Sequence, residues 1–199
     1  MKKGIGVLLL VGMLWASDCR AQIVYPPQTF TFDTSALSGF VGPFQLDFQL
    51  TDGSGTGDGN TSLTVDDFVI DGASAPGIAA ASMTDSAFFT EVMRGFVPGG
   101  TLRFDLSGSF GVDTDPTTGT VTPDEFSLAI LKGDGTEVPT TDPSGALLLV
   151  DFDNLSPGAV TTRVFQIVPA QAVPESDVPV LLVGAGVFGI GFALRRHKA

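Results

Sequence analysis

The chain has 199 residues, a formal net charge of −12 and a single histidine. Its charge is unevenly placed, because residues 22–172 hold four basic residues against nineteen acidic ones. Such an acidic surface repels phosphate backbones, so we expect no nucleic acid among its partners. The only cysteine, Cys19, precedes this region, so no disulfide is expected within it.

The first 21 residues have the three parts of a secretory signal peptide. Two lysines are followed by an apolar run over residues 5–15 and by small residues at Cys19 and Ala21. The run is too short to span a bilayer comfortably. We predict cleavage after Ala21 by signal peptidase. The alternative is a lipoprotein signal with lipid on Cys19, although Asp18 stands where such signals normally have a small residue.

Residues 22–172 are predicted to form the folded domain, because apolar side chains alternate there over short runs separated by turn sequences such as Asp52-Gly53. A continuous apolar run at 147–152 is typical of a strand buried on both faces, and residues 82–92 fit either a short helix or a strand. We predict an all-β fold, an antiparallel β-sandwich of jelly-roll or immunoglobulin-like kind. The period-two runs are Phe30 and Phe32; Phe44, Leu46, Phe48 and Leu50; Leu63 and Val65; Leu102, Phe104 and Leu106; and Phe126, Leu128 and Ile130.

The phenylalanines of the domain are interpreted as core residues, because alternation accounts for most of them. Fourteen of the sixteen lie between Phe30 and Phe165. Sugar-stacking faces usually need exposed tryptophan or tyrosine, and Tyr25 is the only tyrosine. A lectin-like face therefore has little support.

We predict no enzymatic activity. Ser-His-Asp and Cys-His catalysis need an imidazole, and the only one is His197, near the C-terminal end. Zinc sites need clusters of cysteine and histidine that the domain lacks. A glycosidase pair of carboxylates drawn from Glu91, Glu125 and Glu137 with nearby aspartates is the remaining enzymatic alternative.

Calcium is the cofactor that the sequence favours, if there is one. Oxygen-bearing side chains alternate along a glycine-rich loop, as in loops that wrap hard cations; they are Asp52, Ser54, Thr56, Asp58 and Asn60. A second acidic stretch at 113–125 is similar to an EF-hand loop, with one residue too many before its glycine. The alternative is that both are solvated loops, in which Asp and Gly turn easily.

The C-terminal end has an uncharged apolar stretch at 178–194, followed by Arg195 and Arg196 in a basic tail at 195–199. A helix of this length reaches about 25 Å, the short end of what spans a membrane. The basic cluster predicts a cytoplasmic tail and an external domain. The alternative is a buried C-terminal helix or strand of the domain. A G-x-G-x-x-G string beginning at Gly184 lacks the preceding strand of a dinucleotide site.

The stretch at 173–199 resembles the PEP-CTERM sorting signal that exosortases of Gram-negative bacteria process. A short motif, an apolar helix and an arginine cluster follow one another in that signal, and the motif here is Val173, Pro174, Glu175 and Ser176. Ser176 departs from the second proline usual in the family. The resemblance implies a transient inner-membrane anchor and cleavage near Pro174 and Glu175, followed by release or attachment at the outer surface.

These patterns together predict an exported, exosortase-sorted, non-enzymatic protein of the cell surface or extracellular matrix. The resemblance adds an association with exopolysaccharide or biofilm. The alternative is a Ca²⁺-dependent carbohydrate- or protein-binding module that stays anchored in the membrane. The two differ because only the second requires Ca²⁺ for stability or for ligand affinity.

Overall fold

The computed structural model describes residues 22–55, 57–111, 122–153 and 159–170. The predicted signal peptide at 1–21 and the predicted sorting segment at 173–199 lie outside these residues. Within the described part of the chain, no helix is long and apolar enough to cross a membrane.

The described residues form ten strands and one short 3₁₀ helix, η1 (Ser35–Gly39). All pairings between the strands are antiparallel. The fold is therefore all-β, as predicted. The strands are β1 (Ile23–Asp33), β2 (Phe44–Thr51), β3 (Ser62–Ile70), β4 (Ala73–Ser74), β5 (Ala81–Thr84), β6 (Phe89–Phe96), β7 (Thr101–Phe110), β8 (Asp124–Leu131), β9 (Leu148–Asp153) and β10 (Ala159–Val164).

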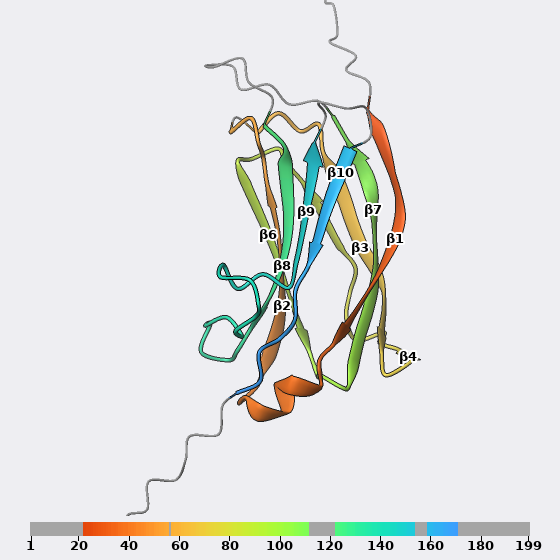
Figure 1. The fold of residues 1–199 in the computed structure, drawn as a ribbon. Coiled ribbons are helices and arrows are strands. Elements are labelled where there is room, and N and C mark those ends of the chain that lie inside the picture. The colour runs from red at the N-terminus through yellow and green to blue at the C-terminus, as the bar shows by residue number, and fades with distance from the viewer. Residues whose placement is uncertain (1–21, 56, 112–121, 154–158, 171–199) are drawn as a thin grey trace, which may run out of the picture. The chain divides into compact units, whose positions relative to one another are not determined.

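The strands make two five-stranded sheets that pack face to face (Figure 1). The first sheet has the order β1-β7-β3-β4, and β5 pairs with another part of β3. The second has the order β10-β9-β8-β2-β6. The chain changes sheet repeatedly, so the loops at the ends of the strands carry the connections between the two layers.

Alternating side chains build the core between the sheets. In β7 the buried residues are Leu102, Phe104, Leu106 and Phe110, all on the same face, as a half-buried strand requires. Phe48 of β2 meets Phe104 of the opposite sheet edge to face, with ring centroids 5.9 Å apart. The continuous apolar run is confirmed as a buried strand, since residues 147–150 are all buried and β9 lies between two neighbours.

Three features refine or correct the sequence-based expectations. Of the two alternatives for residues 82–92, the strand is the one observed, because these residues fall on β5, β6 and the connection between them. The first strand begins at Ile23, with a register shift between Tyr25 and Gln28 that accommodates two prolines. Assigning all the domain phenylalanines to the core was wrong for Phe88 and Phe89, which are 58% and 45% exposed. Phe89 is the first residue of the edge strand β6, which has a paired neighbour on one side only, and Phe88 immediately precedes this strand.

Candidate metal centre

Three buried carboxylates converge at one end of the two sheets. Asp52, Asp85 and Asp124 each offer a carboxylate oxygen, and these oxygens all lie within 4.8 Å of one another. The residues are 1%, 0% and 1% exposed. Buried carboxylates are rare unless something compensates their charge. We refer to the three residues as the aspartate triad.

The strand pairing brings the triad together from distant parts of the sequence. Asp52 follows the last residue of β2, and Asp124 is the first residue of β8. These strands are antiparallel neighbours with Thr51 opposite Glu125, so the end of one meets the start of the other. Asp85 lies in the connection from β5, in the first sheet, to β6, in the second. The triad therefore sits where the two sheets are joined.

Two glycines allow the loop after β2 to approach the other two segments. A Cβ at Gly53 would lie 2.4 Å from the carbonyl oxygens of Thr122 and Pro123, just before Asp124. Gly57, with φ +69°, would bring a Cβ to 2.8 Å from the Ser86 carbonyl oxygen, just after Asp85. Glycine is needed at both positions because the backbones pack directly against each other.

Backbone amides of the same loop bind two of the carboxylates. The Ser54 N–H donates to Oδ1 of Asp52 over 2.7 Å, and the Gly57 N–H donates to Oδ2 of Asp52. The Gly53 N–H donates to Oδ1 of Asp124 over 2.8 Å. Such bonds stabilise the ionised form of a carboxylate.

Thr61, which is fully buried just before β3, connects Asp124 with Asp85. Its hydroxyl donates to Oδ2 of Asp124, and its backbone N–H donates to Oδ1 of Asp85 over 3.0 Å. Five of the six carboxylate oxygens of the triad thus accept a hydrogen bond. The sixth, Oδ2 of Asp85, is buried with no hydrogen-bond partner.

Burial raises the pKa of Asp85 from 3.8 to about 7. The Thr61 N–H opposes this rise, whereas the negative charges of Asp124, Asp58 and Asp52 add to it. Among the described residues, the ion pairs are those of Arg163 with Glu125 and Asp151, so no described basic residue neutralises the triad. A bound proton or a bound cation would balance the negative charge of the triad.

No family model, curated protein or solved structure matches the chain.

The predicted calcium loop is only partly assembled around this centre. Asp52 is a member of the triad, and Ser54 contributes its backbone N–H. Thr56 lies outside the described residues. Asp58 is exposed, and its two oxygens accept hydrogen bonds from the backbone and the side-chain amide of Asn60. The carboxylates that join Asp52 come from other loops.

Sequence reasoning missed Asp85 as a site residue and placed Asp124 in a different candidate loop. Most of that second loop, residues 112–121, lies outside the described residues. One signal was available in the sequence. Each aspartate lies at the end of a strand, Asp85 directly after β5 and Asp124 at the start of β8, and strand ends meet in an antiparallel sheet. Which run pairs with which is a long-range property that local alternation does not contain.

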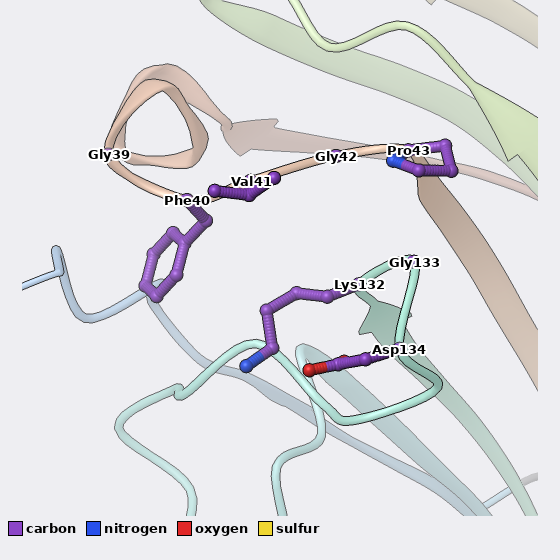
Figure 2. Close-up of a pocket in the computed structure, with 8 residues that line it drawn as sticks. All are labelled: Gly39, Phe40, Val41, Gly42, Pro43, Lys132, Gly133 and Asp134. Atoms are coloured by element: carbon purple, nitrogen blue, oxygen red, sulfur yellow. The ribbon is translucent and has the colours of Figure 1, made fainter.

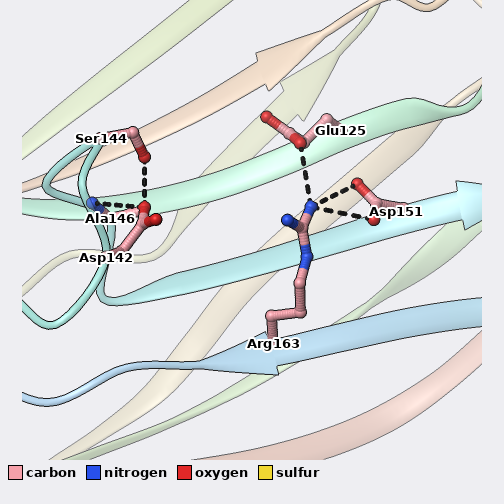
Figure 3. A network of polar contacts seen from close by, with 6 residues as sticks. All are labelled: Glu125, Asp142, Ser144, Ala146, Asp151 and Arg163. Atoms are coloured by element: carbon pink, nitrogen blue, oxygen red, sulfur yellow. Dashed lines mark hydrogen bonds and ion pairs between the residues drawn. The ribbon is translucent and has the colours of Figure 1, made fainter.

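A second polar cluster lies on β8, β9 and β10 (Figure 3). Arg163 reaches Oδ2 of Asp151 over 3.0 Å and Oε2 of Glu125 over 3.5 Å. Burial, followed by the adjacent Asp151, raises the pKa of Glu125. In the same view the Asp142 carboxylate accepts from the Ser144 hydroxyl and the Ala146 N–H. Arg163 pairs across the strands with Asp151 and Glu125, whereas Asp142 is bound by neighbours in its own loop, so contacts within the protein account for both arrangements.

A pocket of about 630 Å³ lies at the other end of β2 and β8 (Figure 2). It is lined by the 39–43 segment and the turn at 132–134, with Lys132 and Asp134 as its charged side chains. The Thr136 hydroxyl and N–H lower the pKa of Asp134. Because these groups hold the turn itself, the aspartate triad is the better candidate for a functional site.

Proposed function

We propose that this chain is an exported, non-enzymatic protein of the bacterial cell surface or extracellular matrix, sorted by an exosortase. The observation that carries the proposal is the order of three elements after the domain. These are the Pro174-Glu175 motif, the apolar stretch at 178–194 and the arginines at 195–196. With the N-terminal signal peptide, they put the domain outside the cytoplasm and hold it in the inner membrane until the motif is cut.

The character of the domain is consistent with a structural or binding role. It is a two-sheet, all-β domain with a strongly acidic composition, and its sequence has no histidine before His197. The acidic surface favours metal ions, cationic groups or neutral glycans over nucleic acid and anionic lipid. An association with exopolysaccharide belongs to the same proposal and rests on the resemblance of the C-terminal segment.

Fractionation of a Gram-negative host that has an exosortase tests the proposal. The wild-type chain is expected at the outer surface or in the medium. A Pro174→Ala, Glu175→Ala double variant is expected in the inner membrane, with its domain facing the periplasm. Pro169→Ala, which changes a nearby proline outside the motif, is the matched control and is expected to behave as wild type.

Inner-membrane retention of all three proteins would instead support a permanently anchored module. Recovery of the wild type from the cytoplasm would contradict export altogether.

A further inference from the structure

One carboxylate oxygen of the aspartate triad has no hydrogen-bond partner among the described residues. Oδ2 of Asp85 is buried without a hydrogen-bond partner, and the same carboxylate lies within reach of two other buried carboxylates. Oδ1 of Asp47 is the other described side-chain atom buried without a partner, but no third carboxylate converges on it. A buried polar atom without a hydrogen-bond partner destabilises the folded state, so a cation bound at the triad would satisfy this oxygen.

The geometry points to one Ca²⁺ ion bound by the carboxylates of Asp52, Asp85 and Asp124, which clamps the two sheets together at this end of the domain.

The donor set fits calcium in its chemistry. All three side chains provide hard oxygen ligands, which Ca²⁺ prefers, and the triad contains no histidine or cysteine to favour zinc. The amide and hydroxyl hydrogen bonds to Asp52 and Asp124 orient those carboxylates and leave lone pairs on them. A divalent cation would neutralise most of the triad's charge.

The spacing of the triad also fits calcium. Ca–O bonds are about 2.3–2.6 Å long, so oxygens on opposite sides of one ion are about 4.6–5.2 Å apart. The triad oxygens lie within 4.8 Å of one another, a distance that a single ion can bridge. Mg²⁺ demands a near-ideal octahedron and usually keeps several waters, so a cluster of three protein carboxylates suits Ca²⁺ better.

An ion at the triad would connect the two sheets. Asp52 and Asp124 belong to the ends of β2 and β8 in one sheet, whereas Asp85 follows β5 in the other. Binding would tie both layers and fix the loop that carries Gly53 and Gly57. It would also hold the segment that leads to the exposed rings of Phe88 and Phe89, since the Asp52 N–H donates to the Phe88 carbonyl over 2.9 Å.

Calcium titration of the purified full-length chain in mild detergent, after removal of metal with EDTA, tests the inference. We expect calorimetry to show one Ca²⁺ per chain, with a Kd no weaker than about 1 mM. The Tm should rise by roughly 5–10 °C once Ca²⁺ is about a hundredfold above Kd. Mg²⁺ and KCl at matched ionic strength control for general screening of the acidic chain.

Asp85→Asn is the decisive variant because its amide oxygen can still accept the Thr61 N–H. It is expected to fold and to lose the Ca²⁺-dependent gain in Tm. Asp105→Asn, which removes an acidic side chain from β7, is the matched control and should keep the gain. Asp58→Asn separates the triad from the predicted loop and should also keep the gain.

The inference is overturned if the folded wild-type chain neither binds Ca²⁺ nor gains stability at 10 mM. It is also overturned if Asp85→Asn keeps the full gain, or if Mg²⁺ or KCl gives the same gain as Ca²⁺. These outcomes leave the proposed export untouched, because none of them depends on processing of the C-terminal segment.

Discussion

Thr61 and Asp85 bind each other through a reciprocal pair of hydrogen bonds: the Thr61 N–H donates to Oδ1 of Asp85 over 3.0 Å, and the Asp85 N–H donates to the Thr61 carbonyl over 3.2 Å. The pair joins the start of β3 to the end of β5, its neighbour in the same sheet. Through the Thr61 hydroxyl it also reaches Asp124 in the other sheet. Thr61 is thus the link that holds the triad in place.

Replacing Thr61 by valine keeps the side-chain shape and removes the hydroxyl. We expect the free energy of unfolding to fall by about 1–3 kcal/mol, because a buried carboxylate oxygen of Asp124 loses its donor. Urea denaturation measures the change. Thr64→Val, in the strand that follows Thr61 and with an exposed hydroxyl contact to Ser82 at 3.5 Å, should cost less than about 0.5 kcal/mol. Equal losses in the two variants would contradict the role given to Thr61.

The stability of the metal-free chain should depend on pH through Asp85. Its pKa is raised in the folded state from 3.8 to about 7, so the folded chain binds a proton more tightly than the unfolded chain. Its contribution to stability is therefore full below about pH 4 and is lost as the pH rises through about 7, a loss on the order of 4 kcal/mol. Urea denaturation in EDTA between pH 4 and pH 8 measures it.

Other carboxylates change in the same direction over this range, because burial raises the pKa of Asp47, Asp66 and Glu125. Asp85→Asn isolates the contribution of Asp85. The variant should be more stable than the wild type in EDTA at pH 8 and should show a flatter pH profile. A wild-type profile identical to that of the variant would contradict the assignment.

Alanine substitutions at Gly55 and Gly57 distinguish the cost of backbone strain from the cost of a steric clash, because the two glycines have nearly the same backbone conformation. Gly55 and Gly57 have φ of +73° and +69°, but a Cβ at Gly55 would touch nothing within 4 Å, whereas one at Gly57 would meet the backbone after Asp85 at 2.8 Å. Gly55→Ala should cost about 1 kcal/mol from conformation alone. Gly57→Ala should cost more and should weaken Ca²⁺ binding as well. Thermal unfolding with and without Ca²⁺ compares them.

The core should be most sensitive at Phe48. This fully buried ring packs against Phe68, Phe104 and Phe126 from both sheets. Phe48→Ala should lower the free energy of unfolding by about 3–5 kcal/mol. Phe89→Ala, at a position 45% exposed on the edge strand, should change it by less than about 1 kcal/mol. A loss at Phe89 as large as that at Phe48 would place β6 in the core, contrary to the structure.

The sequence pattern predicted the strands that have one buried face. It did not predict strands that lack a clearly buried face. Alternation located β2, β7 and β8 because each is packed against the opposite sheet. It did not distinguish helix from strand before β6, because an edge strand with exposed aromatic residues lacks a clear apolar stripe. The start of β1 was hidden by two prolines at its register shift.

Only part of the candidate site could be predicted from the sequence, for a related reason. Asp52 lies in a loop whose composition is itself a signal, whereas Asp85 stands alone between a threonine and a serine. Its importance comes from burial beside two carboxylates that are 33 and 39 positions away in the sequence. Only the pairing of β2 with β8 and of β3 with β5 creates that neighbourhood.

The measurement that tests the proposed function most directly is the intact mass of the protein recovered from the surface of its native host. The account predicts a chain that begins after Ala21 and ends near Glu175, without the apolar stretch at 178–194 and with any attached group as added mass. A mature chain that extends to Ala199 would contradict sorting by an exosortase.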